Sequence, residues 1–328
     1  MVHELPRPLG RISGVSPARK RGYVMAALNV AGVTASVVAH RVVGRRIPKL
    51  AVPASMAVNA IGIVVHDQFE RRRPYREGWK PQPPDTRRDA AFLLAAAPTT
   101  LATSFIAAKV GERVRIRLGV HRLPVIPGIL IGELAFGLWH YWAHRISHEQ
   151  GWAWRVHSVH HSPTRFYTRL GVQVHALELG PDSFADFLIP ILLGLSPQQL
   201  AGVKAIHLWF GTGQHSNADV DHGPLLNLIL STPEQHRWHH SQDYAEGDTN
   251  YCGNFALWDH VFGTYFMPDR PYDSEIGVGR MPSFPRDLVG MQLAPFRWKE
   301  IVEDNADTWY VPAGTPTAFH TPSTSPKS

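Results

Sequence analysis

Long apolar stretches alternate with short basic ones along the first half of the chain. Each of the four apolar stretches is close to the length that a helix needs to cross the hydrocarbon core of a bilayer; they are residues 23–40, 50–66, 90–110 and 123–143. The first two are joined by a short basic connection, as in a helical hairpin, and Pro98 predicts a kink in the third. The pattern predicts about four spanning helices. Its alternative is a set of buried helices in a soluble core.

Two further apolar stretches, residues 184–195 and 200–211, are each short and are separated by Ser196-Pro197. Their length favours a re-entrant or interfacial hairpin over a pair of spanning helices. The predicted fold class is therefore all-α, a membrane helical bundle with interfacial helices and a polar, histidine-rich cap. We expect a flexible basic segment at 1–22, membrane helices at 23–122 with a basic loop at 67–89, a functional domain at 123–302, and a disordered Thr/Pro/Ser-rich tail at 303–328.

Charge refines this picture. The net charge is +6, and the basic residues flank apolar stretches instead of interleaving with aromatic ones, so membrane flanks are favoured over a nucleic-acid partner. The segments 1–22 and 67–89 carry more lysine and arginine than 41–49 and 109–122, which predicts that the first pair, and with it the chain after residue 143, faces the cytoplasm. We expect an integral protein of a bacterial plasma membrane, with no cleavable signal peptide.

Histidines supply the candidate chemistry. Three clusters place imidazoles three or four residues apart, where a helix presents them on one face: Trp142-Ala-His144-Arg-Ile-Ser-His148, His157-Ser-Val-His160-His161 and His236-Arg-Trp-His239-His240. Chance would give about 0.06 copies of His-x-x-His-His in a chain of this composition, and two are present. Because Cys252 is the only cysteine, a thiolate site within one chain is excluded, and nitrogen and oxygen must hold any metal.

The eight clustered histidines are too many for one ion, which needs three or four protein ligands, and are suited to two. His215 is a ninth candidate ligand and His175 a tenth; His140 and His207 are weaker candidates, for a channel or packing role. No catalytic residue beyond the metal ligands is predicted. Glu149, Glu178, Asp219, Asp243 and Asp259 are candidate acceptors for the ring N–H groups of bound histidines.

These motifs, in this order and spacing, resemble the fatty acid hydroxylase/sterol desaturase superfamily of membrane non-haem di-iron enzymes. The similarity covers residues 130–268, including Gln214-His215-Ser216-Asn217, Asn250-Tyr251 and Trp258-Asp259-His260. It implies a di-iron oxidoreductase of lipid metabolism that hydroxylates or desaturates a sterol, fatty acyl chain or carotenoid with dioxygen. It also implies a separate electron donor of the ferredoxin or cytochrome type with its reductase, because no dinucleotide fingerprint is visible.

Three questions stay open at this point. The basic residues from Arg71 to Arg88 could dock an acidic donor, although anchoring to anionic lipid headgroups is favoured. A first alternative function is a histidine-rich membrane metal-binding or transport protein without redox activity. The scarcity of ionisable residues in the apolar stretches disfavours this alternative. A second alternative function is a zinc-dependent membrane hydrolase.

Overall fold

The computed structural model describes residues 15–279 and 281–308, so the predicted flexible N-terminus up to residue 14 and the predicted tail from residue 309 lie outside the described part. Within these residues the fold is helical; no strand is present, and only three isolated β-bridges occur. The all-α prediction is confirmed.

Four long helices come first in the chain: α1 (Pro17–Arg46), α2 (Ala51–Arg72), α3 (Pro83–Arg117) and α4 (Val125–Glu149). The middle of the chain forms α5 (Gly151–His161), α6 (Ala176–Leu192), α7 (Pro197–Ile206), a π-helical turn η4 (His207–Gly211) and α8 (Thr212–Gln214). Short helices follow: α9 (Gly223–Ile229), α10 (Pro233–His239), α11 (Tyr244–Gly247), α12 (Leu257–Phe262), α13 (Leu288–Leu293) and α14 (Trp298–Glu303). The connections contain 3-10 turns at η1 (Pro48–Leu50), η2 (Glu77–Trp79) and η3 (Thr168–Val172).

Three helices of the described chain are long and apolar enough to cross a membrane: Pro17–Arg46, Pro48–Arg72 and Pro83–Arg117. Little of their apolar surface is buried by the rest of the protein, and large side chains such as Leu94 remain exposed, as expected where lipid is the solvent. The fourth predicted stretch forms the first part of α4. It is not among the three, because Glu133 and His140 lie within it and lower its hydropathy.

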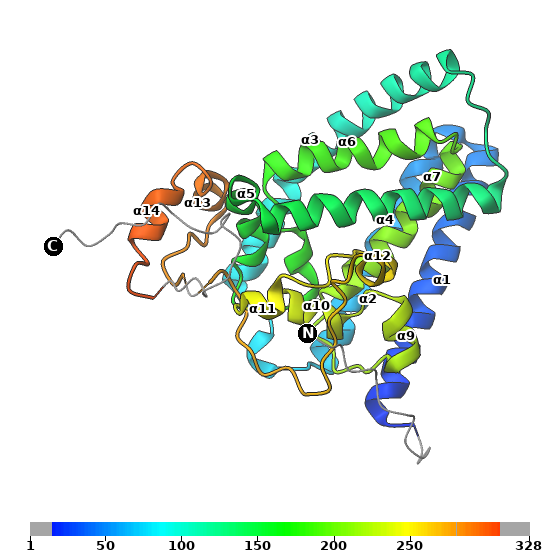
Figure 1. The fold of residues 1–328 in the computed structure, drawn as a ribbon. Helices are drawn as coiled ribbons and strands as arrows, with labels where there is room; N and C mark the ends of the chain where they lie inside the picture. Colours follow the sequence, from blue (N-terminus) through cyan, green and yellow to red (C-terminus); the bar gives the residue numbers. More distant parts are fainter. Residues whose placement is uncertain (1–14, 280, 309–328) are drawn as a thin grey trace.

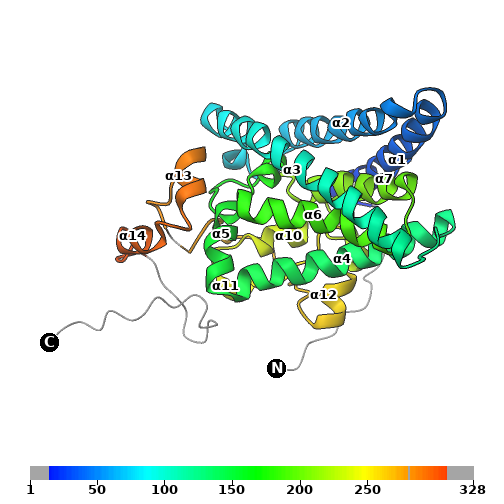
Figure 2. The same ribbon diagram turned by 90° about the horizontal axis from the view of Figure 1, so that it is seen from above.

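The helices are arranged so that the histidine-rich segments gather near the C-terminal end of α4. Helices α1 and α2 pack as a hairpin, α7 lies on α1, and α6 lies along α3 with α4 beside it (Figures 1 and 2). The C-terminal helices α13 and α14 lie beyond α5, at the edge opposite α1 and α7 in both views. A buried apolar cluster that includes Phe92, Trp154 and Trp298 joins this C-terminal part to α3 and α5.

The helices extend into segments for which irregular structure was expected. Helix α1 begins at Pro17 behind a Ser16 N-cap, so residues 17–22 of the predicted lead-in are helical. The basic loop is shorter than 67–89, because α2 continues to Arg72 and α3 begins at Pro83 with a capping box. Arg76 in this loop is used internally: its guanidinium lies over the ring of Trp79 and donates to the backbone carbonyl of Tyr272 (2.7 Å).

Small residues of the first hairpin make room for the indole of Trp209. A Cβ atom on Gly32 would overlap this ring, and one on Gly62 would lie 3.2 Å from it. We expect Gly32→Ala to destabilise the protein by about 1–3 kcal/mol, because the packed rings and helices must move apart. Thermal unfolding in detergent measures this. Gly78→Ala is the matched control, because a Cβ atom there meets nothing within 4 Å; an equal effect of the two substitutions would contradict the prediction.

Candidate metal centre

The first two histidine clusters lie on consecutive helices that fold back on each other. His144 and His148 are four residues apart, near the C-terminal end of α4, and therefore share a face. A single residue with extended backbone, Gln150, separates α4 from α5, which carries His157, His160 and His161. This tight connection brings the two helices together, so the sequence spacing is converted into one concentrated set of imidazoles.

The third cluster reaches the same place from a distant part of the chain. Helix α10 begins with Pro233 behind Thr232 and carries His236 and His239, with His240 as its C-terminal cap. His215 follows the short helix α8. All these rings are buried.

The structure sorts nine of the ten predicted ligands into two groups. The first contains His144, His148, His157, His161 and His239; the second contains His160, His215, His236 and His240. Within each group the candidate ligand atoms all lie within 4.8 Å of one another.

The two His-x-x-His-His motifs divide in the same way. In each copy the first and last histidines, four residues apart, stay together, and the middle one joins the other group. Thus His157 and His161 belong to the first group while His160 belongs to the second, and His236 and His240 belong to the second while His239 belongs to the first. Each motif therefore contributes to both groups.

The Nε2 atoms of neighbouring rings converge. In the first group the Nε2 of His161 lies 3.2 Å from that of His148 and 3.1 Å from that of His157. In the second group the Nε2 of His236 lies 2.9 Å from that of His215 and 3.2 Å from that of His240. Such spacings suit nitrogens that share one ion at metal–nitrogen distances of about 2.0–2.1 Å.

The opposite nitrogens of four rings of the first group face acceptors, which defines the tautomer. Nδ1–H of His148 donates to Asp248 (3.0 Å), and Nδ1–H of His157 donates to Glu178 (2.7 Å). Those of His144 and His239 donate to backbone carbonyls, of Tyr251 and Thr249 respectively, each at 2.8 Å. The Nε2 atoms of His144 and His239 are buried without a partner among the described residues. A metal ion fits these atoms, since metal-bound histidines commonly donate their other N–H to a carboxylate or carbonyl.

Burial lowers the pKa of several of these rings and so favours their neutral form. Loss of hydration lowers the pKa of His215 to about 4 and that of His239 to about 3. The same cause lowers the pKa of His160, His161 and His240 well below the usual value. Neutral imidazole is the form that binds metal ions, so these residues are ready to act as ligands at physiological pH.

A turn after α11 supplies three of the four acceptors. Asp248, Thr249 and Tyr251 each bind a different histidine of the first group. Between them, Asn250 has a left-handed backbone (φ 53°), and its side chain donates to the carbonyl of Phe266 (2.8 Å). Asparagine tolerates this conformation better than most residues. Glu178 is one of the acceptors predicted from the sequence, whereas Asp248 is not, because its only signal in the sequence is its place just before Asn250-Tyr251.

His175 is not brought to either group. Its Nε2–H donates to the carbonyl of Gln292 (2.8 Å), and its Nδ1 accepts from the backbone N–H of Leu177 (3.0 Å) as the N-cap of α6. Both nitrogens are therefore engaged. His140 lies beside the first group, with its ring centroid 5.6 Å from that of His144, but belongs to neither group.

Glu70, a buried residue near the end of α2, ties the membrane hairpin to the second group. Its carboxylate accepts from the N–H (2.8 Å) and hydroxyl (2.8 Å) of Thr168 and from the N–H of Asn217 (2.9 Å), two residues after His215. No local pattern in the sequence indicates this role of Glu70.

We expect Glu70→Ala to destabilise the protein by about 1–3 kcal/mol, because buried donors lose their acceptor. It should also reduce the metal bound per chain, since the segment around His215 loses its anchor. Thermal unfolding and metal analysis measure the two effects. Glu112→Ala, at a carboxylate that pairs with Arg115 and Arg122 instead, is the control; normal stability and metal content in Glu70→Ala would refute the anchor.

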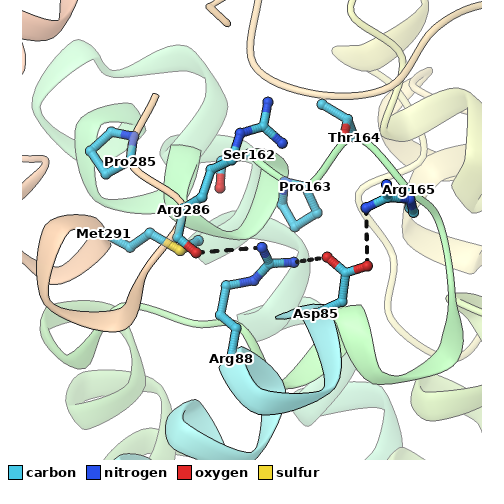
Figure 3. A pocket seen from close by; sticks show the side chains of 9 residues that line it. All are labelled: Asp85, Arg88, Ser162, Pro163, Thr164, Arg165, Pro285, Arg286 and Met291. Atoms are coloured by element: carbon cyan, nitrogen blue, oxygen red, sulfur yellow. Dashed lines mark hydrogen bonds and ion pairs between the residues drawn. The ribbon is translucent and has the colours of Figure 1, made fainter. Parts of the chain in front are cut away.

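The segment after His161 is also attached to α3. Asp85 accepts from Arg165 (3.0 Å) and from Arg88 (3.0 Å), as Figure 3 shows. The hollow that these residues line has a volume of only about 10 Å³. It holds no more than about one water molecule and is therefore too small for a substrate. The ion pairs around it attach the two segments to each other.

Comparison with known proteins places this centre in a family. Residues 129–264, which contain all nine converging histidines, match the fatty acid hydroxylase family. The chain is 35% identical to the ornithine lipid hydroxylase OlsE of Rhizobium tropici over 64% of its own length and 66% of that protein. It is 34% identical to the alkylglycerol monooxygenase of Danio rerio, over 40% of this chain and 29% of that protein.

The sphingolipid C4-hydroxylase sur2 of Schizosaccharomyces pombe is 28% identical over 42% of this chain and 48% of its own length. The chain thus spans less than two thirds of each of these relatives. No solved structure matches. The family match covers nearly the same residues as the resemblance noted in the sequence, and the chain therefore belongs to the fatty acid hydroxylase superfamily.

Proposed function

We propose that this protein is a membrane lipid hydroxylase with a pair of iron ions at its centre. The observation that carries the proposal is the convergence of nine buried imidazoles into two adjoining groups within a fatty acid hydroxylase domain. The proposed ligands are His144, His148, His157, His161 and His239 for one ion, and His160, His215, His236 and His240 for the other. His175 is left out because both of its ring nitrogens have other partners.

When bound, the two ions would supply the activation of dioxygen that an unactivated C–H bond requires. The chain contributes the surroundings. Asp248 and Glu178 hold the rings of His148 and His157 with Nε2 directed inward. The burial of all nine rings keeps bulk water away from them, and the exposed apolar surface of the long helices allows a lipid to approach from the bilayer.

Hydroxylation is favoured over desaturation, because the relatives named above are hydroxylases and monooxygenases. The nitrogen-only ligand groups favour iron over the zinc of a hydrolase, whose sites commonly hold fewer histidines and an open position.

We further propose that electrons come from a ferredoxin- or cytochrome-type donor on the cytoplasmic side of a bacterial plasma membrane. Arg72, Arg73 and Arg87 are exposed near the ends of α2 and α3 and could attract an acidic donor. Arg76 and Arg88 are less available, because they are engaged with Tyr272 and Asp85.

Labelled dioxygen tests the proposal. Cells that express the protein, and cells that express a His160→Ala variant, are grown under isotopically labelled dioxygen, and their lipids are compared by mass spectrometry. We expect one lipid class to gain a single labelled oxygen atom only with the intact protein. If the intact protein binds two metal ions and the lipid profiles of the two strains are nevertheless identical, lipid hydroxylation is ruled out.

A further inference from the structure

A second group of polar side chains lies between the helices next to the metal centre. We call it the inner polar cluster; it consists of Glu133, His140, Asp182, Lys204, His207 and Asn254. Helix α4 supplies Glu133 and His140, α6 and α7 supply Asp182 and Lys204, and the π-helical turn supplies His207. Irregular turns of this kind occur frequently at functional sites.

The cluster adjoins the first histidine group. The ring centroid of His140 lies 5.6 Å from that of His144 and 6.0 Å from that of His207. The Nδ2 of Asn254 donates to Glu133 (2.7 Å), and Asn254 follows closely on Tyr251, whose carbonyl binds His144. The cluster and the metal centre are therefore continuous.

Several polar atoms of the cluster are buried without a partner in the described chain. They are Oε2 of Glu133, Oδ1 of Asn254 and Nδ1 of His207. The last two face the same space, since both lie within 4 Å of the point where a Cβ atom on Gly211 would be. Buried polar atoms are normally paired, so a local group of unpaired acceptors indicates a missing donor.

The charges of the cluster are also unbalanced. Lys204 pairs with Asp186 (2.6 Å). Asp182 has no hydrogen-bond or ion-pair partner among residues 15–279 and 281–308, and Glu133 has only the amide of Asn254. Within this described part of the chain, Lys204 is thus the one cation whose charge acts on three carboxyl groups, those of Glu133, Asp182 and Asp186, and an excess of buried negative charge is costly.

The cluster is close to an exposed apolar face of α4. Leu130 and Leu134, which flank Glu133 on α4, are 59% and 47% exposed. A lipid whose chain lies against this face of α4 can therefore bring its polar head to Glu133 while remaining in contact with apolar surface.

We propose that the inner polar cluster binds the ammonium group of a lipid substrate with an amine-bearing head. An ammonium supplies both missing features at once: hydrogen-bond donors for the unpaired atoms of Glu133, Asn254 and His207, and a second positive charge in a cluster rich in carboxyl groups. This inference rests on the proposed function and adds the chemical class of the substrate.

Binding of three probes with the same alkenyl or acyl chain tests it: oleylamine, oleyl alcohol and methyl oleate. The purified, metal-loaded protein is titrated with each probe in detergent and binding is followed by native mass spectrometry. We expect oleylamine to bind at least about tenfold more tightly than the other two, as for a charge partner in a buried site. The double variant Glu133→Gln/Asp182→Asn should lose this preference while keeping its metal content.

Two further variants separate charge from folding. Lys204→Met frees Asp186 and should strengthen oleylamine binding, and Glu112→Gln, outside the cluster, should leave all three affinities unchanged. If the double variant loses metal, the Lys204→Met variant decides. Stronger oleylamine binding in this variant supports the proposal, and unchanged or weaker binding contradicts it. Equal binding of oleylamine and oleyl alcohol, or a preference that survives in the metal-loaded double variant, would overturn the proposal. Lipid labelling by dioxygen is independent of these titrations, so failure here leaves the proposed hydroxylation to its own test.

Discussion

His239→Ala is expected to reduce lipid hydroxylation at least about a hundredfold and to release the metal of the first group. The side chain is buried, its Nδ1–H is fixed on the carbonyl of Thr249, and its Nε2 is directed toward the other four ligands. Alanine removes this nitrogen and leaves a cavity that water can enter. Because even partners of metal ligands are worth about 10–100-fold, loss of a ligand should cost at least as much. Elemental analysis of the purified variant and the yield of hydroxylated lipid measure the effect.

His175→Asn is the matched control. It removes another buried histidine of the same domain, but asparagine also caps a helix N-terminus, so α6 should be preserved. We expect normal metal content and activity in this variant. If His175→Asn loses as much metal as His239→Ala, metal loss reflects general damage and the assignment of His239 fails.

Glu178→Ala is expected to reduce metal affinity and activity about 10–100-fold. Glu178 lies in the first turn of α6 and accepts the Nδ1–H of His157 at 2.7 Å. Without this acceptor the His157 ring is free to rotate or to move its proton to Nε2, which would block the nitrogen that faces the metal. Glu178→Gln retains an oxygen acceptor and should recover part of the activity. Metal-binding titrations on the three proteins provide the comparison.

Glu149→Gln serves as the control for this series. Glu149 is also close in sequence to the first cluster, but it pairs with Arg145 at 2.6 Å and not with a ring nitrogen. It should retain full metal affinity. A loss in Glu149→Gln equal to that in Glu178→Ala would show that net charge near the centre matters more than the hydrogen bond to His157.

Local spacing was sufficient to identify most of the residues that converge. Histidines three and four residues apart on short helices must share a face, and nine of the ten predicted ligands come together. Spacing alone could not assign His160 and His239 to the group opposite their neighbours, because this depends on how α5 and α10 face each other across the fold. His175 shows the limit of the pattern: its surroundings in the sequence resemble those of a ligand, while its packing against Gln292 gives it a capping role.

Contacts between distant segments account for what was missed in the fold. Glu70 and Thr168 are far apart in the chain, so no periodicity connects them, and Asp248 binds His148 across a similar separation. Hydropathy predicted the hairpin of α1 and α2 and the apolar length of α3. In α4, Glu133 and His140 interrupt the apolar stretch, so hydropathy alone supports this helix less strongly as a span.

His160 and His239 each belong to the group opposite that of their neighbours in the sequence, so the two halves of the centre are interlocked. If one of the two proposed ions dissociates, the histidines that it releases belong to helices that also supply ligands to the other ion. The remaining ion should therefore be bound more weakly in a half-occupied protein. Filling should therefore be cooperative: a stepwise metal titration would show mostly empty and fully occupied molecules, and a cell short of the metal would hold fewer active molecules instead of many partly active ones.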